Sequence, residues 1–443
     1  MSRPLRALVV SYAFPPVGGA GVQRVLKLVK YLPHHGATAA VLTVANPSVP
    51  LRDASFERDV PARTEVRRTR TLEPGYGAKR LAWNAAASVA PGVLARGKRR
   101  LAGLGRHLLV PDPQVLWLPS AGLALAARLA SRDPDDVVFI SGPPFSQFLL
   151  AALARRHPRT AIVLDYRDEW TTTRGLYEMG GAARASRWLE RRILGAAHAV
   201  TTATEAFRAE LLARFEFLDP RRVRAIPNGY DAEDFPATLP SPAPGRFVLT
   251  YAGTVFRLTS ARGLLDAVRL LHAREPELAR LLEVRFVGRI VETEAPYFAG
   301  TEAIGVRRLG YLEHDQALAE LARSHAVVCL LEDLPGAARI YPAKIFELMY
   351  LRRRCLALAA EGALADLVRL HALGDVVHPA DVEGIAAALA RMLRLFRDGR
   401  LDAIHSPAAS DAVGIERFDR RRLAGEFAQV FRDAVSTARA AHG

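Results

Sequence analysis

The sequence predicts an α/β protein built from two doubly wound, parallel-sheet domains. Short apolar runs rich in β-branched and aromatic residues alternate with segments of helical periodicity, as in parallel sheets covered by helices. The alternation stops at a proline-rich stretch and then begins again. The chain has 443 residues, of which 50% are apolar and 24% charged, so it is globular and too long for one ordinary core.

The first half opens with a strand, a glycine-rich loop and a helix. The run RALVVSYAF at 6–14 predicts the strand, and apolar residues at helical spacing in GVQRVLKLVKYLPHHG predict the helix. ATAAVLTVAN then predicts a second buried strand, so the opening is a β-loop-α-β unit. Later runs repeat the pattern, with strands expected in 135–144, 160–170, 199–204 and 223–229, and helices in 146–157 and 185–198.

A proline-rich linker at 236–246 separates a first domain, 1–235, from a second domain, 247–405. In the second domain we expect strands in FVLTYAGT, LEVRFVGR, AVVCLLED, CLALAA and VVHP, with helices in ARGLLDAVRLLHA and PAKIFELMYLRRR. A final amphipathic helix is expected within 415–443. Its apolar stripe consists of Phe418, Leu423, Phe427, Val430 and Phe431.

The composition limits the compartment and the partners. With 61 Lys and Arg against 46 Asp and Glu, the net charge is +15. This suggests an anionic partner such as a phosphate-bearing substrate, nucleic acid or an anionic membrane, although an Arg and Ala bias of the whole chain would give the same charge. Cys329 and Cys355 lie in apolar segments, and no window holds about 18 uninterrupted apolar residues. We therefore expect a cytoplasmic protein without a transmembrane helix, either soluble or peripheral on the inner face of the cell membrane.

The glycine-rich loop SYAFPPVGGAGVQRVLK is not a dinucleotide fingerprint. Gly19 and Gly21 fit the first two positions, but Arg24 stands at the third and no acid ends the second strand. A P-loop is excluded because no Gly-Lys-Ser/Thr follows. Two interpretations remain open. Backbone N–H groups and the helix N-terminus bind an anion, or the glycines only form a tight turn.

Charged residues also follow strands of the second domain. Arg257 and Arg262 come after its first strand and suit a diphosphate, although they could equally be solvated. Lys344 and Glu347 share one face near the start of a helix. A carboxylate there can accept hydrogen bonds from a ribose diol while the lysine meets phosphate, or the two can form an ordinary surface ion pair.

Several segments together resemble one family along the whole chain. They are FPPVGGAGVQR, SGPPFS, DYRDEW, IPNGYDAEDF, YAGT with its two arginines, and YPAKIFELMYLRRRCLAL. In order and spacing they resemble GT-B glycosyltransferases of family 4, the retaining enzymes that use nucleotide sugars. The resemblance implies two Rossmann-like domains facing a cleft, an acceptor domain followed by a donor domain, and a C-terminal helix that returns to the first domain. It also implies transfer of a sugar to a hydroxyl acceptor, with glycolipid, polysaccharide or glycoconjugate biosynthesis as candidate settings.

The resemblance assigns roles to residues of this chain. It places Gly19 and Gly21 near the donor diphosphate and the acceptor. Arg257 and Arg262 would neutralise the leaving diphosphate, and Glu347 would hold the donor ribose. Arg339 stands where the family usually has a first glutamate, eight residues before Glu347, which is a departure from the common pattern. A subgroup with a P-x-K-x-F-E helix resembles this chain more closely. No metal or other cofactor is expected besides the donor as co-substrate.

Arg167 and Asp168, in DYRDEW, lie at the expected cleft edge of the first domain. They are candidate catalytic residues or an Arg–Asp pair that only fixes the loop. Two alternatives to an active enzyme also stay open. Arg339 suggests a catalytically inactive GT-B-shaped protein that binds nucleotide sugars. The charge suggests a nucleic-acid-binding protein, but no stacking-aromatic motif or recognition helix supports one, so we expect no nucleic-acid partner.

One segment, residues 75–110, has no acidic residue and is rich in cations. It is either a surface for anionic lipid or a lipid-linked acceptor, or a solvated helical insertion. Its basic residues, interleaved with apolar ones and Trp83, are Lys79, Arg80, Arg96, Lys98, Arg99, Arg100 and Arg106.

Overall fold

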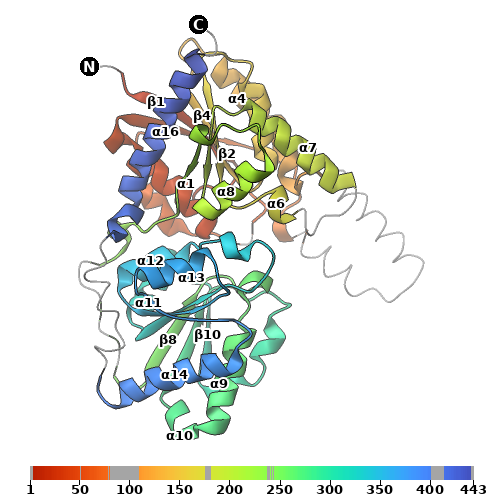
Figure 1. Cartoon of the computed structure of the whole chain (residues 1–443). Coiled ribbons are helices and arrows are strands. Elements are labelled where there is room, and N and C mark those ends of the chain that lie inside the picture. The colour runs from red at the N-terminus through yellow and green to blue at the C-terminus, as the bar shows by residue number, and fades with distance from the viewer. Residues whose placement is uncertain are drawn as a thin grey trace. The chain divides into compact units, whose positions relative to one another are not determined.

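The computed structural model divides the chain into two compact units. It describes residues 3–49, 51–77, 79, 109–174, 181–236, 240, 242, 244–400 and 414–440. Unit 1 comprises Met1–Pro227 with Leu423–Gly443, and unit 2 comprises Asn228–Arg422. Figure 1 shows the elements of each unit. Most of the basic segment 75–110, including Arg80, Trp83, Arg96, Lys98, Arg99, Arg100 and Arg106, lies outside the described residues.

Unit 1 is built on a parallel sheet of seven strands in the order β3-β2-β1-β4-β5-β6-β7. The strand order reverses between β1 and β4, which makes this a doubly wound sheet. The strands are β1 (Leu5–Val10), β2 (Ala37–Val44), β3 (Val66–Thr69), β4 (Val137–Gly142), β5 (Ala161–Tyr166), β6 (Ala199–Thr202) and β7 (Val223–Ala225). The helices are α1 (Ala20–Tyr31), α4 (Leu118–Leu129), α5 (Leu150–Ala154), α6 (Thr171–Arg174), α7 (Gly181–Ala196), α8 (Glu205–Arg214) and most of α16 (Arg420–Ala440).

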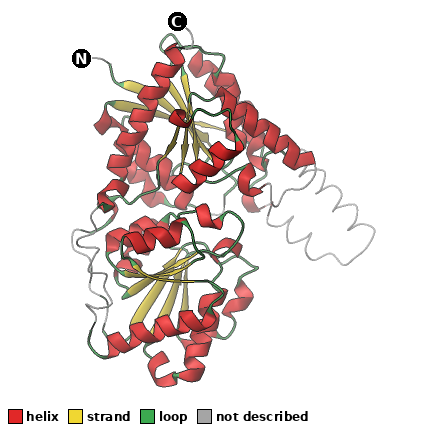
Figure 2. Ribbon diagram, in the orientation of Figure 1, coloured by secondary structure: helices red, strands yellow, loops and turns green. Residues whose placement is uncertain are grey.

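Strands β4, β5 and β6 of this sheet are buried throughout, which explains why the sequence of the sheet's centre is largely apolar, whereas the edge strand β3 is partly exposed. Ala7 and Val9 of β1 join the core formed with α1 and α16. Leu8 and Val10, which alternate with them, join the core formed with α4, α5 and α8 on the other face. Figure 2 shows the helices on both sides of the sheet.

The C-terminal helix α16 packs onto unit 1, as expected. Phe427 and Phe431 are buried, and their ring centroids lie 5.6 Å and 5.4 Å from that of Phe139 in β4. Phe418 was wrongly included in this stripe. It ends a 3-10 turn (Ile415–Phe418) before the helix, and its ring lies 4.9 Å from that of Phe346 in unit 2.

We expect the Phe431→Ala variant to lose about 3–5 kcal/mol of unfolding free energy, because a fully buried aromatic ring leaves a cavity between α16 and the sheet. Ser436→Ala on the exposed face of the same helix is the matched control and should stay within about 0.5 kcal/mol of the parent. Urea unfolding followed by tryptophan fluorescence measures both. A parent-like midpoint for Phe431→Ala would show that α16 does not contribute to the core of unit 1.

Unit 2 repeats the architecture with a parallel sheet of six strands in the order β10-β9-β8-β11-β12-β13. Here the order reverses between β8 and β11. The strands are β8 (Phe247–Ala252), β9 (Leu282–Val287), β10 (Val306–Gly310), β11 (Ala326–Leu330), β12 (Arg354–Leu358) and β13 (Gly374–Val377). The helices are α9 (Arg262–Arg274), α10 (Pro276–Ala279), α11 (His314–Ala322), α12 (Lys344–Leu351), α13 (Ala363–Leu370) and α14 (Val382–Arg397).

The division between the units falls at Pro227, earlier in the chain than the expected domain boundary at 235. The physical reason is aromatic packing within unit 2. The rings of Tyr230 and Phe235 lie 4.7 Å and 4.5 Å from that of Tyr350 in α12. The backbone N–H of Tyr230 also donates to the carbonyl of Phe418. These contacts fasten the segment after Pro227 to unit 2.

Candidate functional site

In unit 1 the glycine-rich loop connects β1 to α1, and two of its glycines have distinct surroundings. Gly19, the residue before α1, has φ of 101°, in the region that favours glycine. At Gly21, a Cβ atom would lie 2.8 Å from Nη1 of Arg167. The backbone at Gly21 therefore lies close to the Arg167 guanidinium, and a side chain there would displace the flexible end of Arg167.

Arg167, a predicted catalytic residue, is engaged with the backbone of two loops. Its guanidinium donates to the carbonyl oxygens of Gly21, after β1, and Pro143, after β4. Desolvation lowers the pKa of Arg167, and the carboxylates of Asp168 and Asp165 act in the opposite direction. Asp168 lies exposed at the end of β5. Arg167 thus joins the loops on either side of the β1–β4 reversal, where ligands bind in doubly wound sheets.

A buried ion pair lies beneath this loop, and the sequence did not predict it. Arg24 donates from Nη2 to Oδ1 of Asp165 at 2.7 Å and from Nε to Oδ2 at 3.0 Å. The hydroxyls of Ser141 and Thr201 donate to the same carboxylate at 2.7 Å and 2.8 Å. Burial alone would raise the pKa of Asp165, but the charge and hydrogen bonds of Arg24 hold it below its ordinary value. The arginine at the third glycine position therefore anchors α1 to β4, β5 and β6.

In unit 2 the two loops that flank the strand reversal are tied together. The backbone N–H of Glu332, after β11, donates to the carbonyl of Leu258, after β8, at 2.8 Å. Arg257 begins a 3-10 turn (Arg257–Thr259) and is exposed. Arg262 opens α9 with 66% of its side chain exposed, and its Nε lies 3.7 Å from Oδ2 of Asp266. The structure thus places both arginines at the carboxyl edge of the sheet, beside the reversal.

Lys344 and Glu347 form the expected pair at the start of α12. Nζ of Lys344 lies 2.9 Å from Oε2 of Glu347, whose other oxygen is 4.0 Å from Nε2 of His314. The histidine in turn lies 3.3 Å from Oδ2 of Asp234. Glu347 is only 4% exposed. Burial would raise its pKa, but the charges of Lys344 and His314 hold it below the ordinary value, so the carboxylate is ionised near neutral pH.

Arg339 lies on the loop between β11 and α12, five residues before Lys344. It ends a 3-10 turn (Ala337–Arg339) that follows Gly336, whose φ is 87°. This turn packs tightly against the start of α13, because a Cβ atom on Gly362 would lie 2.5 Å from the carbonyl oxygen of Ala338. Arg339 is half-buried, and the loop that contains it leads directly into α12, where Lys344 and Glu347 lie. Its contact with a donor stays a prediction.

Glu332 is a further charged residue at this edge that the sequence analysis did not single out. Burial raises the pKa of its carboxyl, and the neighbouring charge of Glu294 adds to the effect. The positive charges of His378 and Arg262 act against it. The sequence signal was available, since LLED ends an apolar run with two acids at the point where the strand must stop.

Comparison with known proteins adds to this geometry. The model of the family described as Glycosyltransferase Family 4 matches residues 17–234. The alpha-maltose-1-phosphate synthase of Mycolicibacterium smegmatis is 30% identical over 194 residues, which cover 40% of this chain and 48% of that protein. The chain thus matches about half the length of this curated relative.

Two solved structures are similar along nearly the whole chain. The N-terminal domain of Candida albicans trehalose-6-phosphate phosphatase has a TM-score of 0.64 at 11% identity and covers 98% of this chain and 97% of that one. Anabaena HepE, solved with UDP and glucose, has a TM-score of 0.60 at 15% identity, with coverage of 96% and 98%. These similarities confirm the predicted fold class, two Rossmann-like domains of the GT-B type with a C-terminal helix returning to the first.

Proposed function

We propose that this chain is a family 4 glycosyltransferase that moves a sugar from a nucleoside diphosphate sugar to a hydroxyl group of an acceptor. The observation that carries the proposal is the carboxyl edge of unit 2. Exposed Arg257 and Arg262 lie on the loop after β8 and at the start of α9, and the Lys344–Glu347 pair lies at the start of α12. A hydrogen bond between Glu332 and Leu258 ties together the loops after β11 and β8 at the strand reversal. The family match over 17–234 and the likeness to HepE, solved with UDP and glucose, support it.

The residues of unit 2 suit the separate parts of such a donor. The guanidiniums of Arg257 and Arg262 would bind the diphosphate, with Lys344 beside it, and the ionised carboxylate of Glu347 would accept hydrogen bonds from the ribose. Arg339, on the same loop, would reach the sugar. When the bond from the anomeric carbon to the phosphate oxygen breaks, its electron pair stays on the diphosphate. Fixed cations stabilise that growing charge, so the proposal needs no metal.

The loops of unit 1 would receive the acceptor. Gly19 leaves backbone room before the N-terminus of α1, and the guanidinium of Arg167, which occupies the space beside Gly21, holds that loop in place. We assign Asp168, at the end of β5, to receive the proton of the acceptor hydroxyl as its oxygen bonds to the anomeric carbon. Retention of the anomeric configuration is part of the proposal, and proton NMR of the first-formed product would test it.

A thermal-shift panel of nucleoside diphosphates and nucleotide sugars tests donor binding directly, because a ligand that binds only the native state raises the melting temperature by mass action. We expect one nucleoside diphosphate and its sugar to stabilise the protein while the matching nucleoside does not. The Glu347→Ala variant should lose that stabilisation. A flat response across the panel would contradict the proposal.

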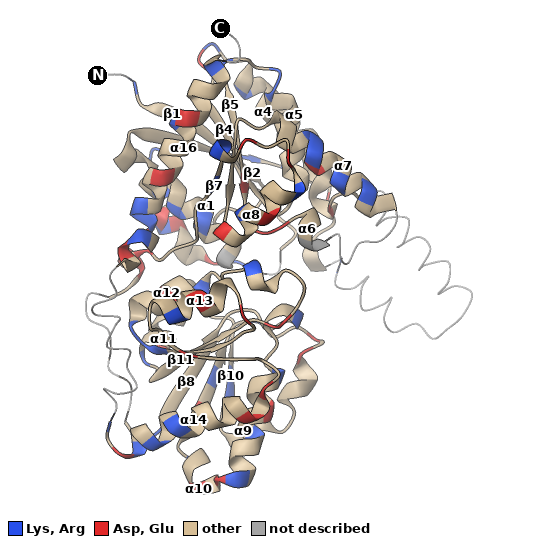
Figure 3. Ribbon diagram, in the orientation of Figure 1, with Lys and Arg blue, Asp and Glu red and all other residues tan. Residues whose placement is uncertain are grey.

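The acceptor is proposed to be lipid-linked, with unit 1 resting on an anionic membrane. Among the described residues, no helix has both the length and the apolar composition to cross a bilayer. Helix α7, in contrast, carries several basic residues (Figure 3), and Trp188 in the same helix is 60% exposed. The acid of this helix, Glu190, is buried. The cations on the exposed face are Arg184, Arg187, Arg191 and Arg192. Tryptophan and arginine together suit the membrane interface.

Replacing Arg187 and Arg191 together by glutamine should weaken binding to anionic vesicles by roughly tenfold to thirtyfold, at about 1 kcal/mol for each charge, and added salt should shrink the difference. Replacing Arg422 and Arg439, two exposed cations of α16, together by glutamine makes the same change in net charge and serves as the control. Vesicle co-sedimentation provides the measurement. Equal effects from both pairs would mean that net charge, and not the α7 face, drives the association.

A further inference from the structure

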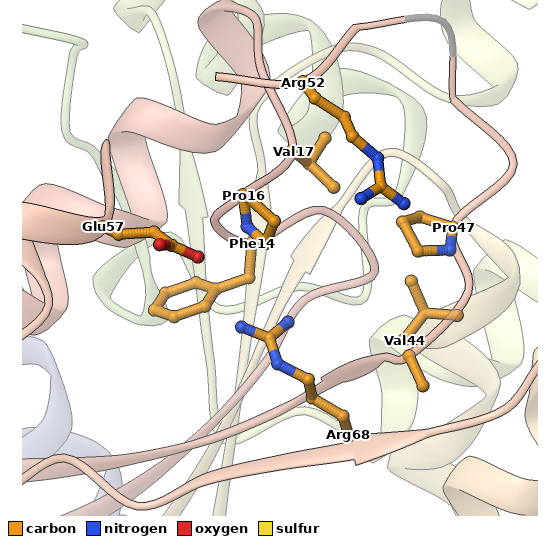
Figure 4. A pocket seen from close by; sticks show the side chains of 9 residues that line it. Phe14, Pro16, Val17, Val44, Pro47, Arg52, Glu57 and Arg68 are labelled. Atoms are coloured by element: carbon orange, nitrogen blue, oxygen red, sulfur yellow. The ribbon is translucent and has the colours of Figure 1, made fainter. Parts of the chain in front are cut away.

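A hollow of about 160 Å³ lies at the carboxyl edge of the unit 1 sheet, beside the start of the glycine-rich loop. Its apolar wall includes Phe14 and Val17, from the loop after β1, and Val44, from the end of β2. The charged side chains of Arg52, Glu57 and Arg68 complete the lining. Figure 4 shows the two guanidiniums approaching the hollow from different sides. The function argued above uses none of these residues.

The backbone that carries Arg52 is fixed, although its guanidinium is not engaged. Arg52 forms an antiparallel bridge with Val17, and the backbone N–H of Gly18 donates to the carbonyl of Leu51. The backbone N–H of Asp53 donates to Pro16. Within the described part of the chain, the guanidinium of Arg52 has no hydrogen bond or ion pair. The fold thus holds a cation with unused donors at the rim of the hollow.

Arg68 supplies the second cation from strand β3. Its Nη2 donates to the carbonyl of Pro15 at 2.7 Å, which orients the guanidinium and leaves its other N–H groups available. Arg68 shares a sheet face with Val66, whereas Arg67 points to the opposite face. Within the described residues, neither Arg52 nor Arg68 has a carboxylate within 4.0 Å, although Glu57 lines the same hollow.

Two guanidiniums without carboxylate partners, opposite an apolar wall, are the donors that proteins use for oxyanions. The carboxylate of Glu57 would repel an oxyanion placed beside it but would accept hydrogen bonds from hydroxyl groups. The hollow therefore suits a ligand that has both, with the anionic group toward Arg52 and Arg68 and hydroxyls toward Glu57. Its volume leaves room for a tetrahedral oxyanion and part of the molecule that carries it.

We propose that this hollow is an acceptor subsite that binds a phosphate or carboxylate group borne by a hydroxyl-rich acceptor. The inference rests on the proposed glycosyl transfer and names the acceptor's chemical class. The placement supports it, because Pro16 and Val17 lead directly into the loop that contains Gly19 and Gly21. The anionic group could belong to a soluble sugar phosphate or to a lipid headgroup, and both would present the same oxyanion to the two arginines.

Isothermal titration with glucose 6-phosphate, galacturonate and glucose tests the subsite, and phosphatidic acid vesicles form the lipid arm. We expect Arg52→Gln to weaken binding of the anionic probe about tenfold, and Arg52→Gln with Arg68→Gln to abolish it. Arg67→Gln, the neighbouring cation on the other face of β3, is the matched control and should bind like the parent. Within the described residues the side chain of Arg52 is exposed and makes no hydrogen bond or ion pair, so we expect this variant to fold. Binding of the anionic sugars that the double variant loses identifies a soluble acceptor. Because the α7 face is also expected to bind anionic vesicles, a headgroup is identified only by vesicle binding that the Arg52→Gln with Arg68→Gln variant loses and Arg67→Gln keeps.

Nucleotide affinity measured on the same variants separates this inference from the proposed function. If anion binding depends on Arg52 and Arg68 while nucleotide affinity is unchanged, the subsite is supported. If the double variant binds the anionic probes like the parent, or if Arg67→Gln weakens them equally, the subsite is overturned while donor binding stands. If no nucleotide binds the parent but the anion does, the proposed function fails and the anion site remains.

Discussion

Replacing Arg24 by leucine should destabilise unit 1 by about 3–5 kcal/mol at neutral pH, because it leaves the buried carboxylate of Asp165 without its cation. Ser141 and Thr201 can still donate to Asp165, but they carry no compensating charge. The four tryptophans of the chain all lie within the residue range of unit 1, so their fluorescence follows its unfolding by urea. The double variant Arg24→Leu with Asp165→Asn should recover much of the loss, because it removes both charges.

The stability lost in the Arg24→Leu variant should also depend on pH in a defined direction. The pKa of Asp165 is lowered in the folded state, so the pair stabilises the protein above the unfolded pKa and loses this contribution as pH falls through the folded pKa. The difference in unfolding free energy between the parent and Arg24→Leu should therefore be largest at neutral pH. It should shrink in acid, where the carboxyl of Asp165 becomes protonated. A difference that stays constant from neutral to acid pH would mean that lost packing, and not the unpaired carboxylate, causes the instability.

Replacing Glu347 by alanine should weaken donor binding by about 10- to 150-fold, the equivalent of roughly 1.5–3 kcal/mol for charged hydrogen bonds to a neutral diol. Glu347→Gln keeps the side chain's shape and one hydrogen-bond acceptor oxygen, so its loss of donor affinity should be smaller. Because Lys344 and His314 also face this carboxylate, either variant could disturb α12. Anion binding to the Arg52–Arg68 hollow in unit 1 is the internal control and should not change. Wild-type donor affinity and turnover in Glu347→Ala would overturn the assignment.

The sequence predicted the central strands of both sheets because they are buried on both faces, but it did not predict β3, an edge strand whose two arginines are exposed. VVFISG, for example, becomes β4 without an exposed residue. Sequence-based prediction failed for residues whose contact partners are far away in the sequence. Phe418 continues the helical spacing of α16, but the backbone N–H of Tyr230 holds that turn against unit 2. The segment after Pro227 has no periodicity and was assigned to the first domain, because nothing local shows that its aromatic rings stack on Tyr350.

The candidate sites show the same limit. The sequence identified Arg167 as important, but its partners are backbone carbonyls of two other loops, which no motif encodes. Arg24 and Asp165 are 141 residues apart, and each alone is only a charge within an apolar segment. The Lys344–Glu347 pair was predictable because helical spacing alone brings the two side chains together. Arg52 and Arg68 line the same hollow because a backbone bridge ties Arg52 to Val17 and a hydrogen bond ties Arg68 to Pro15, both in the loop after β1.

The most direct test of glycosyl transfer is to measure, in one reaction, release of the nucleoside diphosphate and formation of the glycoside by the purified protein. The donor is the nucleotide sugar that stabilises the protein most, and a phosphorylated and a neutral acceptor are compared. We predict that the two products form in equal amounts and that release depends on the acceptor. Arg257→Ala and Arg262→Ala should slow turnover more than they weaken donor binding, because the charge on the leaving group grows in the transition state. A protein that binds nucleotide sugars but forms neither product with any acceptor, or that binds none, would contradict the account.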